Sequence, residues 1–388
     1  MRRIPKVILL IEPSRAYGRG LLRGIVKYSR LHGPWIFYRK PPYYRKPGEW
    51  VKALSHWKRL DADGIIMVEQ ENPEEIISTD LPIIASPYIE ERIPGVPNIV
   101  GDTARMGKMA AEHLLERGFR HFAYCGFEDM FGARSRGEYF HKSVAEAGFK
   151  TYFYKQPKPR ARRSWENEQV LMADWLKSLP KPVGLMACTD DRSQDVVEAC
   201  KLAGLHVPEQ VAIIGVDNDE LVCELSNPPL SSIALNAERA GYDAAELLDK
   251  LMQGKKITNQ TITVQPTHIV TRQSTDILAV DDIEVAEALR FIRRHAKEPI
   301  QVINVADSVA LSRRALQQRF RRILNRTVFD EIRHARMEQA ARMLAETNLS
   351  VSQIAQDLGY SGVEKMSRSF RREVGMSPLA YRKRYGIK

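Results

Sequence analysis

The strongest constraint on the fold is an alternation of short apolar runs and amphipathic stretches across residues 6–272. The runs are apolar at consecutive positions, as strands buried on both faces are. The stretches between them have helical periodicity, and three end at Gly118, Gly204 and Gly254, as helix C-caps do. This alternation predicts parallel α/β sheets with right-handed crossovers, built as one sheet or as two lobes. The candidate strands are KVILLI, GIIMV, PIIAS, HFAYCGF, VGLMACT and QVAIIGV.

Polar residues gather directly after the ends of three candidate strands. In open α/β sheets, ligands bind outside the carboxyl ends of the strands, where carboxylates can accept hydrogen bonds from sugar hydroxyls. The alternative interpretation is that the aspartates cap helices or form turns. The residues are Ser14, Arg15 and Tyr17 after the first strand, Asp190 and Asp191 after GLMACT, and Asp217, Asn218 and Asp219 after VAIIGV.

No motif in the sequence indicates an enzyme. The first strand is not followed by G-x-G-x-x-G, and the chain has no Walker loop, H-E-x-x-H pair or G-x-S-x-G elbow. The nine histidines are scattered. We therefore predict a protein without catalytic residues, metal site or cofactor.

The four cysteines show no C-x-x-C pairing, so we expect buried thiols, although a metal or redox site is the alternative. The apolar runs are far shorter than the ~20 residues of a membrane span. The N-terminus has no export signal either, because its apolar run is short and no small-residue cleavage site follows. Together these features predict a cytoplasmic protein with no membrane partner. The cysteines are Cys125, Cys188, Cys200 and Cys223.

Positive charge is concentrated near the end of the chain. Residues 281–388 contain 21 Lys and Arg against 13 Asp and Glu, which is +8 of the total net charge of +11. Such a concentration is typical of a domain that binds nucleic acid. The alternative is a basic surface that only keeps the protein soluble.

The boundary between the two parts follows from a change of composition. Apolar strand signals stop after Arg272, acidic residues cluster, and a helix begins near Ile283 with Asp282 as a candidate cap. We predict an α/β domain over 1–275, a linker over 276–284 and an all-α domain over 285–388.

The basic part contains a near-repeat. Phe320 and Phe370 lie fifty positions apart, and each is followed by two arginines and preceded by a short helix and a turn. This pattern predicts two helix-turn-helix units. In each unit an apolar stripe at helical spacing packs the helix: Leu316, Phe320 and Ile323 in the first, Val363, Met366, Phe370 and Val374 in the second.

Other faces of the same helices carry charged and amide side chains. Arg pairs bidentately with guanine and Gln with adenine, each worth about 1–3 kcal/mol of discrimination. The alternative for any one of them, Arg321 and Arg372 above all, is phosphate contact or solvation. The candidates are Arg314, Gln317, Gln318 and Arg321 in the first unit and Lys365, Arg368 and Arg372 in the second.

Capping signals agree with this segmentation. Ser350 with Gln353 and Ser361 with Glu364 have capping-box spacing. We also expect Thr327 to cap the helix between the units, and Pro378 to occupy the first position of a final helix.

Two segments resemble the effector domain of the lactose/galactose repressor family: GDTARMGKMAAEHLLERGFRHFAYCGF and TDDRSQDVVEACKLAGLHVPEQVAIIGVDNDE. The resemblance implies a type I periplasmic-binding-protein-like fold with two α/β lobes and a sugar in the cleft between them. By motif position it implies ligand contacts from Arg136, Asp190 and Asp217, with weaker claims for Asp191, Asn218 and Asp219. Ser14, Arg15 and Tyr17 would line the cleft by position only. In that family a DNA-binding headpiece precedes the first strand, which begins here by Lys6, so we expect the DNA-binding part elsewhere.

The stretch IAQDLGYSGVEKMSRSFRREVGMSPLAYR resembles the AraC family of DNA-binding domains. The resemblance covers about 100 residues and implies DNA recognition by both helix-turn-helix units. That family often has Tyr-Phe where this chain has Lys365-Met366, which leaves the base preference there open. By family position the base contacts come from Arg313, Arg314, Gln317, Gln318, Lys365, Ser367 and Arg368.

The order of the two domains, with AYGRGLLRGI after the first strand, resembles bacterial regulators of pentose operons. It implies a sugar-responsive transcription regulator, an activator of pentose catabolism with D-xylose as effector. We expect a nucleoid-associated homodimer whose partners are operator DNA and RNA polymerase. The alternatives are a sugar-binding protein whose basic tail has a non-DNA partner, and a repressor that responds to another sugar.

Overall fold

The computed structural model describes residues 3–39, 61–68, 73–157, 164–255, 257, 260–277, 282–324 and 326–386. Its contacts divide the chain into two compact units. Neither unit is a continuous segment, because the chain passes between them several times. Unit 1 consists of residues 1–103, 127–136 and 235–265, and unit 2 of residues 104–126, 137–234 and 266–388.

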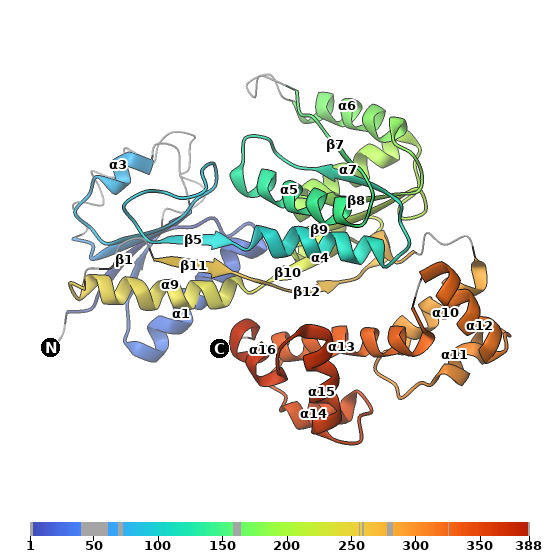
Figure 1. The fold of residues 1–388 in the computed structure, drawn as a ribbon. Coiled ribbons are helices and arrows are strands. Elements are labelled where there is room, and N and C mark those ends of the chain that lie inside the picture. The colour runs from blue at the N-terminus through green and yellow to red at the C-terminus, as the bar shows by residue number, and fades with distance from the viewer. Residues whose placement is uncertain are drawn as a thin grey trace. The chain divides into compact units, whose positions relative to one another are not determined.

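Unit 1 is built on a six-stranded sheet of order β11-β5-β4-β3-β1-β2, in which all neighbouring strands are parallel (Figure 1). The strands are β1 (Lys6–Leu10), β2 (Ile36–Tyr38), β3 (Gly64–Val68), β4 (Ile83–Ser86), β5 (Asn98–Gly101) and β11 (Thr261–Val264). The helices are α1 (Ala16–His32), α3 (Pro73–Ile77) and α9 (Ala237–Met252).

Both faces of this sheet are covered, which explains why its central strands, β1, β3 and β4, are apolar at most positions. In β1, Val7 and Leu9 pack with residues of α1 and α9, whereas Ile8 and Leu10 point to the other face and pack with Ile76 of α3. Side chains alternate across a strand, so a run without polar residues fits a sheet buried on both sides.

Helices α1 and α9 pack unusually closely, and glycine makes this possible. A Cβ atom on Gly24 would lie 1.9 Å from the carbonyl oxygen of Glu238, and one on Gly241 would lie 2.1 Å from that of Leu21. Any side chain at either position would push the two helices apart.

Unit 2 begins with a second six-stranded sheet, of order β12-β10-β9-β8-β6-β7. Its strands are β6 (His121–Cys125), β7 (Thr151–Phe153), β8 (Val183–Ala187), β9 (Val211–Asp217), β10 (Ser231–Leu235) and β12 (Pro266–Val270). The helices around it are α4 (Thr103–Leu115), α5 (Phe131–Glu146), α6 (Trp165–Ser178), α7 (Asp190–Ala203) and α8 (Glu220–Leu225), with the short 3-10 helix η3 (Gln273–Thr275).

The structure confirms all the predicted strands, which are β1, β3, β4, β6, β8 and β9. It also adds strands that the apolar pattern did not indicate: β2 and β7 have only three residues each, and β5, β10, β11 and β12 contain polar residues. The four cysteines are buried free thiols in unit 2, as expected.

The rest of unit 2 is helical (Figure 1). Its long helix α13 contributes to two apolar cores: Val328, Ile332 and Ala335 to the first, and Ala340 and Leu344 to the second. α13 is therefore the common support of both helix-turn-helix units. The helices are α10 (Ile283–Arg294), α11 (Val302–Ser308), α12 (Arg313–Leu324), α13 (Val328–Glu346), α14 (Val351–Asp357), α15 (Val363–Val374) and α16 (Pro378–Tyr385).

The predicted double helix-turn-helix is confirmed by α11–α12 and α14–α15. Phe320 and Phe370, on which the prediction rested, are fully buried, one in each core. The predicted linker falls partly outside the described residues, because 278–281 are not described; α10 begins at Ile283. No helix in the described part of the chain is both long and apolar enough to cross a membrane.

Most predicted caps are confirmed, and one is wrong. Asp282, Thr327 and Ser350 each accept a hydrogen bond from the backbone of the helix they precede, and Pro378 begins α16. Ser361 does not cap α15, because the helix begins one residue later than the capping box requires. Its N-cap is Gly362, which has an extended backbone and no side-chain cap.

Candidate effector site and nucleic-acid interface

In unit 2 the carboxyl end of β9 has an unusual backbone. Asp217 and Asn218 have φ angles of 106° and 48°, which side-chain-bearing residues rarely adopt. Two contacts hold Asn218 there: its N–H donates to Ser232 Oγ (3.0 Å), and its Oδ1 accepts from Arg272 Nη1 (3.0 Å). Such conformations cost about 1–3 kcal/mol and cluster at ligand sites. The strand end therefore fits the predicted position of a ligand site.

Asp190 lies against this strand end and is almost fully buried, at 2% exposed. Its Oδ2 accepts a hydrogen bond from the Asp219 N–H (2.7 Å). A Cβ atom on Gly215 would lie 2.3 Å from Asp190 Oδ1, so only glycine in β9 leaves room for this carboxyl group. Burial and the neighbouring charge of Asp217 hold the pKa of Asp190 well above its ordinary value. Asp190 thus positions the 217–219 loop, and its contact with a sugar stays a prediction.

The other predicted ligand residues of unit 2 lie at the same end of the sheet. Asp191 is half-buried in the first turn of α7, and Asp219 is buried immediately before α8. The structure thereby brings the predicted aspartates of unit 2 close to two successive strand ends, β8 and β9.

Unit 1 contains the remaining predicted ligand residues. Tyr17 makes a hydrogen bond of 2.9 Å to the Ser86 hydroxyl, so it lies where β4 ends. The Ser14 carbonyl oxygen accepts hydrogen bonds from Arg19 Nη1 (2.7 Å) and from Arg15 Nη1 (3.4 Å), and Arg15 is the N-cap residue of α1. Arg136 belongs to this unit through residues 127–136 and is half-buried in α5.

Sequence reasoning missed Arg272. Its side chain is 12% exposed, donates to Asn218 Oδ1 and pairs with Glu224 Oε1 (2.7 Å). The signal was present, because Arg272 follows the end of β12 as the predicted aspartates follow β8 and β9. That strand contains Pro266 and His268, so it lacked the continuous apolar run by which the others were recognised.

The second helix of each helix-turn-helix unit presents the predicted DNA-contacting residues. In helix-turn-helix proteins this helix enters the major groove. On α12, Arg313, Arg314, Gln318 and Arg321 are exposed and Gln317 is half-buried. On α15, Lys365, Arg368 and Arg372 are exposed and Ser367 is half-buried.

Two adjacent open hollows lie along α15. Both are lined by Arg368 and Arg372; Ser367 lines one of them and Lys365 the other. A concave surface edged by guanidinium groups is suited to an anion such as a phosphate group.

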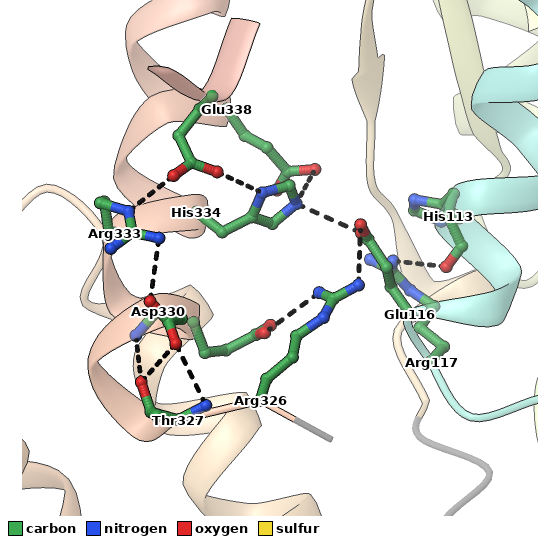
Figure 2. A network of polar contacts seen from close by, with 11 residues as sticks. His113, Glu116, Arg117, Arg326, Thr327, Asp330, Arg333, His334 and Glu338 are labelled. Atoms are coloured by element: carbon green, nitrogen blue, oxygen red, sulfur yellow. Dashed lines mark hydrogen bonds and ion pairs between the residues drawn. The ribbon is translucent and has the colours of Figure 1, made fainter. Parts of the chain in front are cut away.

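One group of side chains could in principle hold a metal ion. Among the described residues, ligand atoms of Glu116, His334 and Glu338 lie within 4.8 Å of one another (Figure 2). However, Arg326 also pairs with the Glu116 carboxylate, at 3.3 Å. Burial opposes ionisation of His334, but the hydrogen bond to Glu116 and the charges of the surrounding carboxylates together outweigh burial and raise the pKa of His334 to about 10. The group is therefore an ion-pair cluster and not a metal site.

Comparisons with known protein families identify both parts of the chain. A periplasmic binding protein-like domain matches residues 111–275, and a helix-turn-helix domain matches residues 305–384. These matches and the two sheets confirm the predicted fold class, an α/β periplasmic-binding-protein-like domain followed by an all-α helix-turn-helix domain.

Several relatives match nearly the whole chain. The chain is 31% identical to the xylose operon regulatory protein of Escherichia coli (strain K12), over 97% of this chain and 96% of the relative. It is 30% identical to that of Haemophilus influenzae, over 97% and 98%. The solved structure of a xylose-binding transcription activator matches with a TM-score of 0.62 and 29% identity, over 100% of both chains. The chain therefore belongs to the family of the xylose operon regulatory proteins.

Proposed function

We propose that this protein is a transcription regulator that binds D-xylose and activates genes of xylose catabolism. The observation that carries the proposal is the full-length similarity to xylose operon regulatory proteins and to a xylose-binding activator. A match confined to one domain would support only a sugar-binding module or only a DNA-binding module.

We propose that the sugar contacts the strained end of β9. The Asp217 carboxylate accepts hydrogen bonds from sugar hydroxyls, and Asn218 and Arg272 hold the loop in its conformation. The other residues that we assign to the sugar are Ser14, Arg15, Tyr17, Arg136, Asp190, Asp191 and Asp219.

We propose that α12 and α15 enter successive major grooves of the operator, about 34 Å apart along the helix axis. The base-contacting residues are those predicted from the sequence, and Arg321 and Arg372 contact phosphates. The protein acts in the cytoplasm on the nucleoid as a homodimer, and as an activator it contacts RNA polymerase.

Calorimetry with D-xylose tests the sugar site. The Asp217→Ala variant should bind D-xylose about 10–100-fold more weakly than the wild type, because a hydrogen bond to a charged group contributes about 1.5–3 kcal/mol. Asp174→Ala is the matched control, because this carboxylate is exposed on α6 of the same unit. It should leave the affinity unchanged.

Unchanged affinity of the Asp217→Ala variant would exclude this site. A titration series with L-arabinose and D-glucose tests the choice of effector, since binding of one of these sugars in place of D-xylose would contradict the proposal. A promoter reporter tests the direction of control: expression should rise with D-xylose only when the protein is present.

A further inference from the structure

We propose that Glu116 is the point through which sugar binding in unit 2 is coupled to DNA binding. The inference rests on the proposed function, because it assumes that D-xylose and DNA influence each other's binding. It assigns that influence to one carboxylate and its contacts with the helix-turn-helix part, which are all formed within unit 2.

Glu116 follows the last residue of α4, a position that is unfavourable for a carboxylate. The C-terminus of a helix carries partial negative charge, which destabilises an acidic side chain there by a few tenths of a kcal/mol up to about 1 kcal/mol. The side chain of Glu116 is also only 19% exposed. A charge placed there requires compensation from nearby cations.

The compensating cations come from the helix-turn-helix part. Arg326 Nη2 lies 3.3 Å from Glu116 Oε1, and His334 Nε2 lies 3.2 Å from Glu116 Oε2. Figure 2 shows Glu116 between these two side chains. Glu338 lies near the same His334 Nε2, at 3.7 Å, and Glu373 lies near the other ring nitrogen, at 4.0 Å from Nδ1. Arg326 lies in the turn directly after α12, and His334 lies on α13. One carboxylate therefore contacts both the turn after a DNA-contacting helix and the helix that supports both helix-turn-helix units.

The charges of this cluster persist over the physiological pH range. Burial alone would raise the pKa of Glu116, but the hydrogen bond from His334 and the charges of His334 and Arg326 lower it to about 2. The pKa of His334 is raised to about 10. The other charged groups around the cluster include Glu112, Arg117, Arg293, Glu331, Glu338 and Glu373. The contact therefore responds to changes of position and not to a change of protonation near pH 7.

The residue after Glu116 connects α4 to η3. Arg117 is 4% exposed and donates to the carbonyl oxygen of Thr275 (2.9 Å), to that of His113 (3.0 Å) and to Thr271 Oγ1 (3.4 Å). His113 also contacts the Thr275 hydroxyl (2.9 Å). Burial and the nearby charge of Arg117 hold the pKa of His113 well below its ordinary value, so its ring is neutral.

From Thr275 the contacts continue to the proposed sugar loop. The Thr275 hydroxyl donates to Ser231 Oγ (2.7 Å), which also accepts from the Arg272 N–H (2.8 Å). Arg272 in turn donates to Asn218 Oδ1, at the strained end of β9. Buried, fully bonded groups of this kind move together and not one by one. A shift of the 217–219 loop on sugar binding would reach α4 through them.

A second set of contacts fixes the other half of the helical part. Tyr381 of α16 donates to the carbonyl oxygen of Thr267, Arg342 donates to that of Ile269 (3.4 Å), and His268 pairs with Glu346 (3.0 Å). These contacts join α16 and the end of α13 directly to β12. The hydrogen-bonded path from the sugar loop therefore reaches the helical part near α12 at Glu116.

The test compares DNA affinity with and without sugar in the full-length protein. The probe is a fluorescent duplex that the wild-type protein selects from a random pool, and the sugar is D-xylose. The ratio of the two dissociation constants is the coupling factor, which is about 5–150 in typical allosteric proteins. Glu116→Gln should bring this factor close to 1 and leave the D-xylose affinity within about threefold of the wild-type value.

Glu198→Gln is the matched control. Glu198 lies on α7 of the same unit and pairs with Lys201 of the same helix (2.8 Å), so the coupling factor of this variant should equal that of the wild type. His334→Gln should lower the factor as Glu116→Gln does. The double variant should be no worse than either single one, because both remove the same contact.

The outcomes separate the two proposals. If the wild-type protein has a coupling factor of 1 or does not bind D-xylose, the proposed function is wrong. If the wild type has a coupling factor above 1 and Glu116→Gln has the same factor, only the role of Glu116 is overturned. Should the variants fail to fold, amide hydrogen exchange of the wild type decides: D-xylose should change exchange at residues 111–117 and 328–338, and no change in either segment would overturn the inference.

Discussion

The two DNA-contacting helices, α12 and α15, carry similar basic side chains but use them differently. On α12, Arg319 pairs with Asp282 (3.0 Å) and Glu284 (3.0 Å), and Arg322 lies 3.5 Å from Asp282. On α15, none of the ion pairs between described residues involves Lys365, Arg368 or Arg371. Part of the positive charge of α12 pairs with acidic groups at the start of α10, whereas most of the positive charge of α15 is exposed and forms no ion pair with a described residue.

This difference indicates that the two helix-turn-helix units contribute differently to DNA binding and to the response to sugar. The first helix-turn-helix unit is held by two acidic groups, because Asp282 binds α12 and Glu116 binds the turn that follows α12. The second unit has an exposed basic helix and hollows edged by guanidinium groups. We therefore expect the second helix-turn-helix unit to contribute more of the binding free energy for DNA. The first helix-turn-helix unit should contribute more of the response to sugar.

The largest expected effect concerns the second unit. Arg368→Ala should weaken binding to the selected duplex by about 5–150-fold, because loss of a bidentate base contact costs about 1–3 kcal/mol. Arg314→Ala on α12 should cost less and should mainly relax base preference. Fluorescence anisotropy at one fixed salt concentration measures both.

Arg372→Ala separates base contact from charge. It should weaken all duplexes to a similar degree and lower the slope of affinity against salt by about one, as loss of a phosphate contact does. A larger loss from Arg314→Ala than from Arg368→Ala would reverse the comparison between the units.

Periodic patterns of apolar residues predicted most of the fold, because each strand or helix must bury apolar side chains at a regular spacing. The apolar run of β1 follows from burial on both sides of a sheet, and the stripe of Met366 and Phe370 follows from the helical period. The error at Ser361 has a local cause: glycine is also an acceptable N-cap, so Gly362 could start α15 one residue later.

The candidate site was less predictable, because its decisive contacts join residues far apart in the sequence. Glu116 and His334 are separated by 218 positions, and nothing near either one indicates the other. The burial of Asp190, at the start of α7, depends on the absence of a side chain at Gly215 in β9. An aspartate after a strand looks the same in the sequence whether it faces a ligand or supports a loop.

A smaller effect is expected from the caps of the two units. Asp282→Ala removes the N-cap of α10 and the ion pair with Arg319, so it should destabilise the first helix-turn-helix unit by at least about 1 kcal/mol. Ser350→Ala removes the N-cap of α14, which forms no ion pair, and should destabilise the second helix-turn-helix unit by about 1 kcal/mol. Amide hydrogen exchange should accelerate in α10–α12 for the first variant and in α14–α15 for the second.

Acid distinguishes these two caps, because only one of them titrates. Burial opposes ionisation of Asp282, but hydrogen bonds from the Val285 N–H and from Arg319 outweigh it and hold its pKa below the ordinary value. The stabilisation from Asp282 is therefore complete above its unfolded pKa of about 4 and is lost as the pH falls through the lower folded value. Amide exchange in α10–α12 should accelerate over that pH range in the wild type. If acid accelerates exchange equally in Asp282→Ala, the pH dependence does not come from Asp282.

The smallest expected effect lies in the turns within the two units. Ala310 in the first turn has φ of 52°, whereas the second turn has Gly359 with φ of 71°. The left-handed conformation costs alanine roughly 1–2 kcal/mol, and glycine in the unfolded chain costs about 0.5–1 kcal/mol of entropy. Ala310→Gly should therefore stabilise the first unit only slightly, which slower amide exchange in α11 and α12 would detect. The control Ala315→Gly lies inside α12 and should accelerate that exchange; equal acceleration in both variants would mean that the Ala310 backbone is not strained.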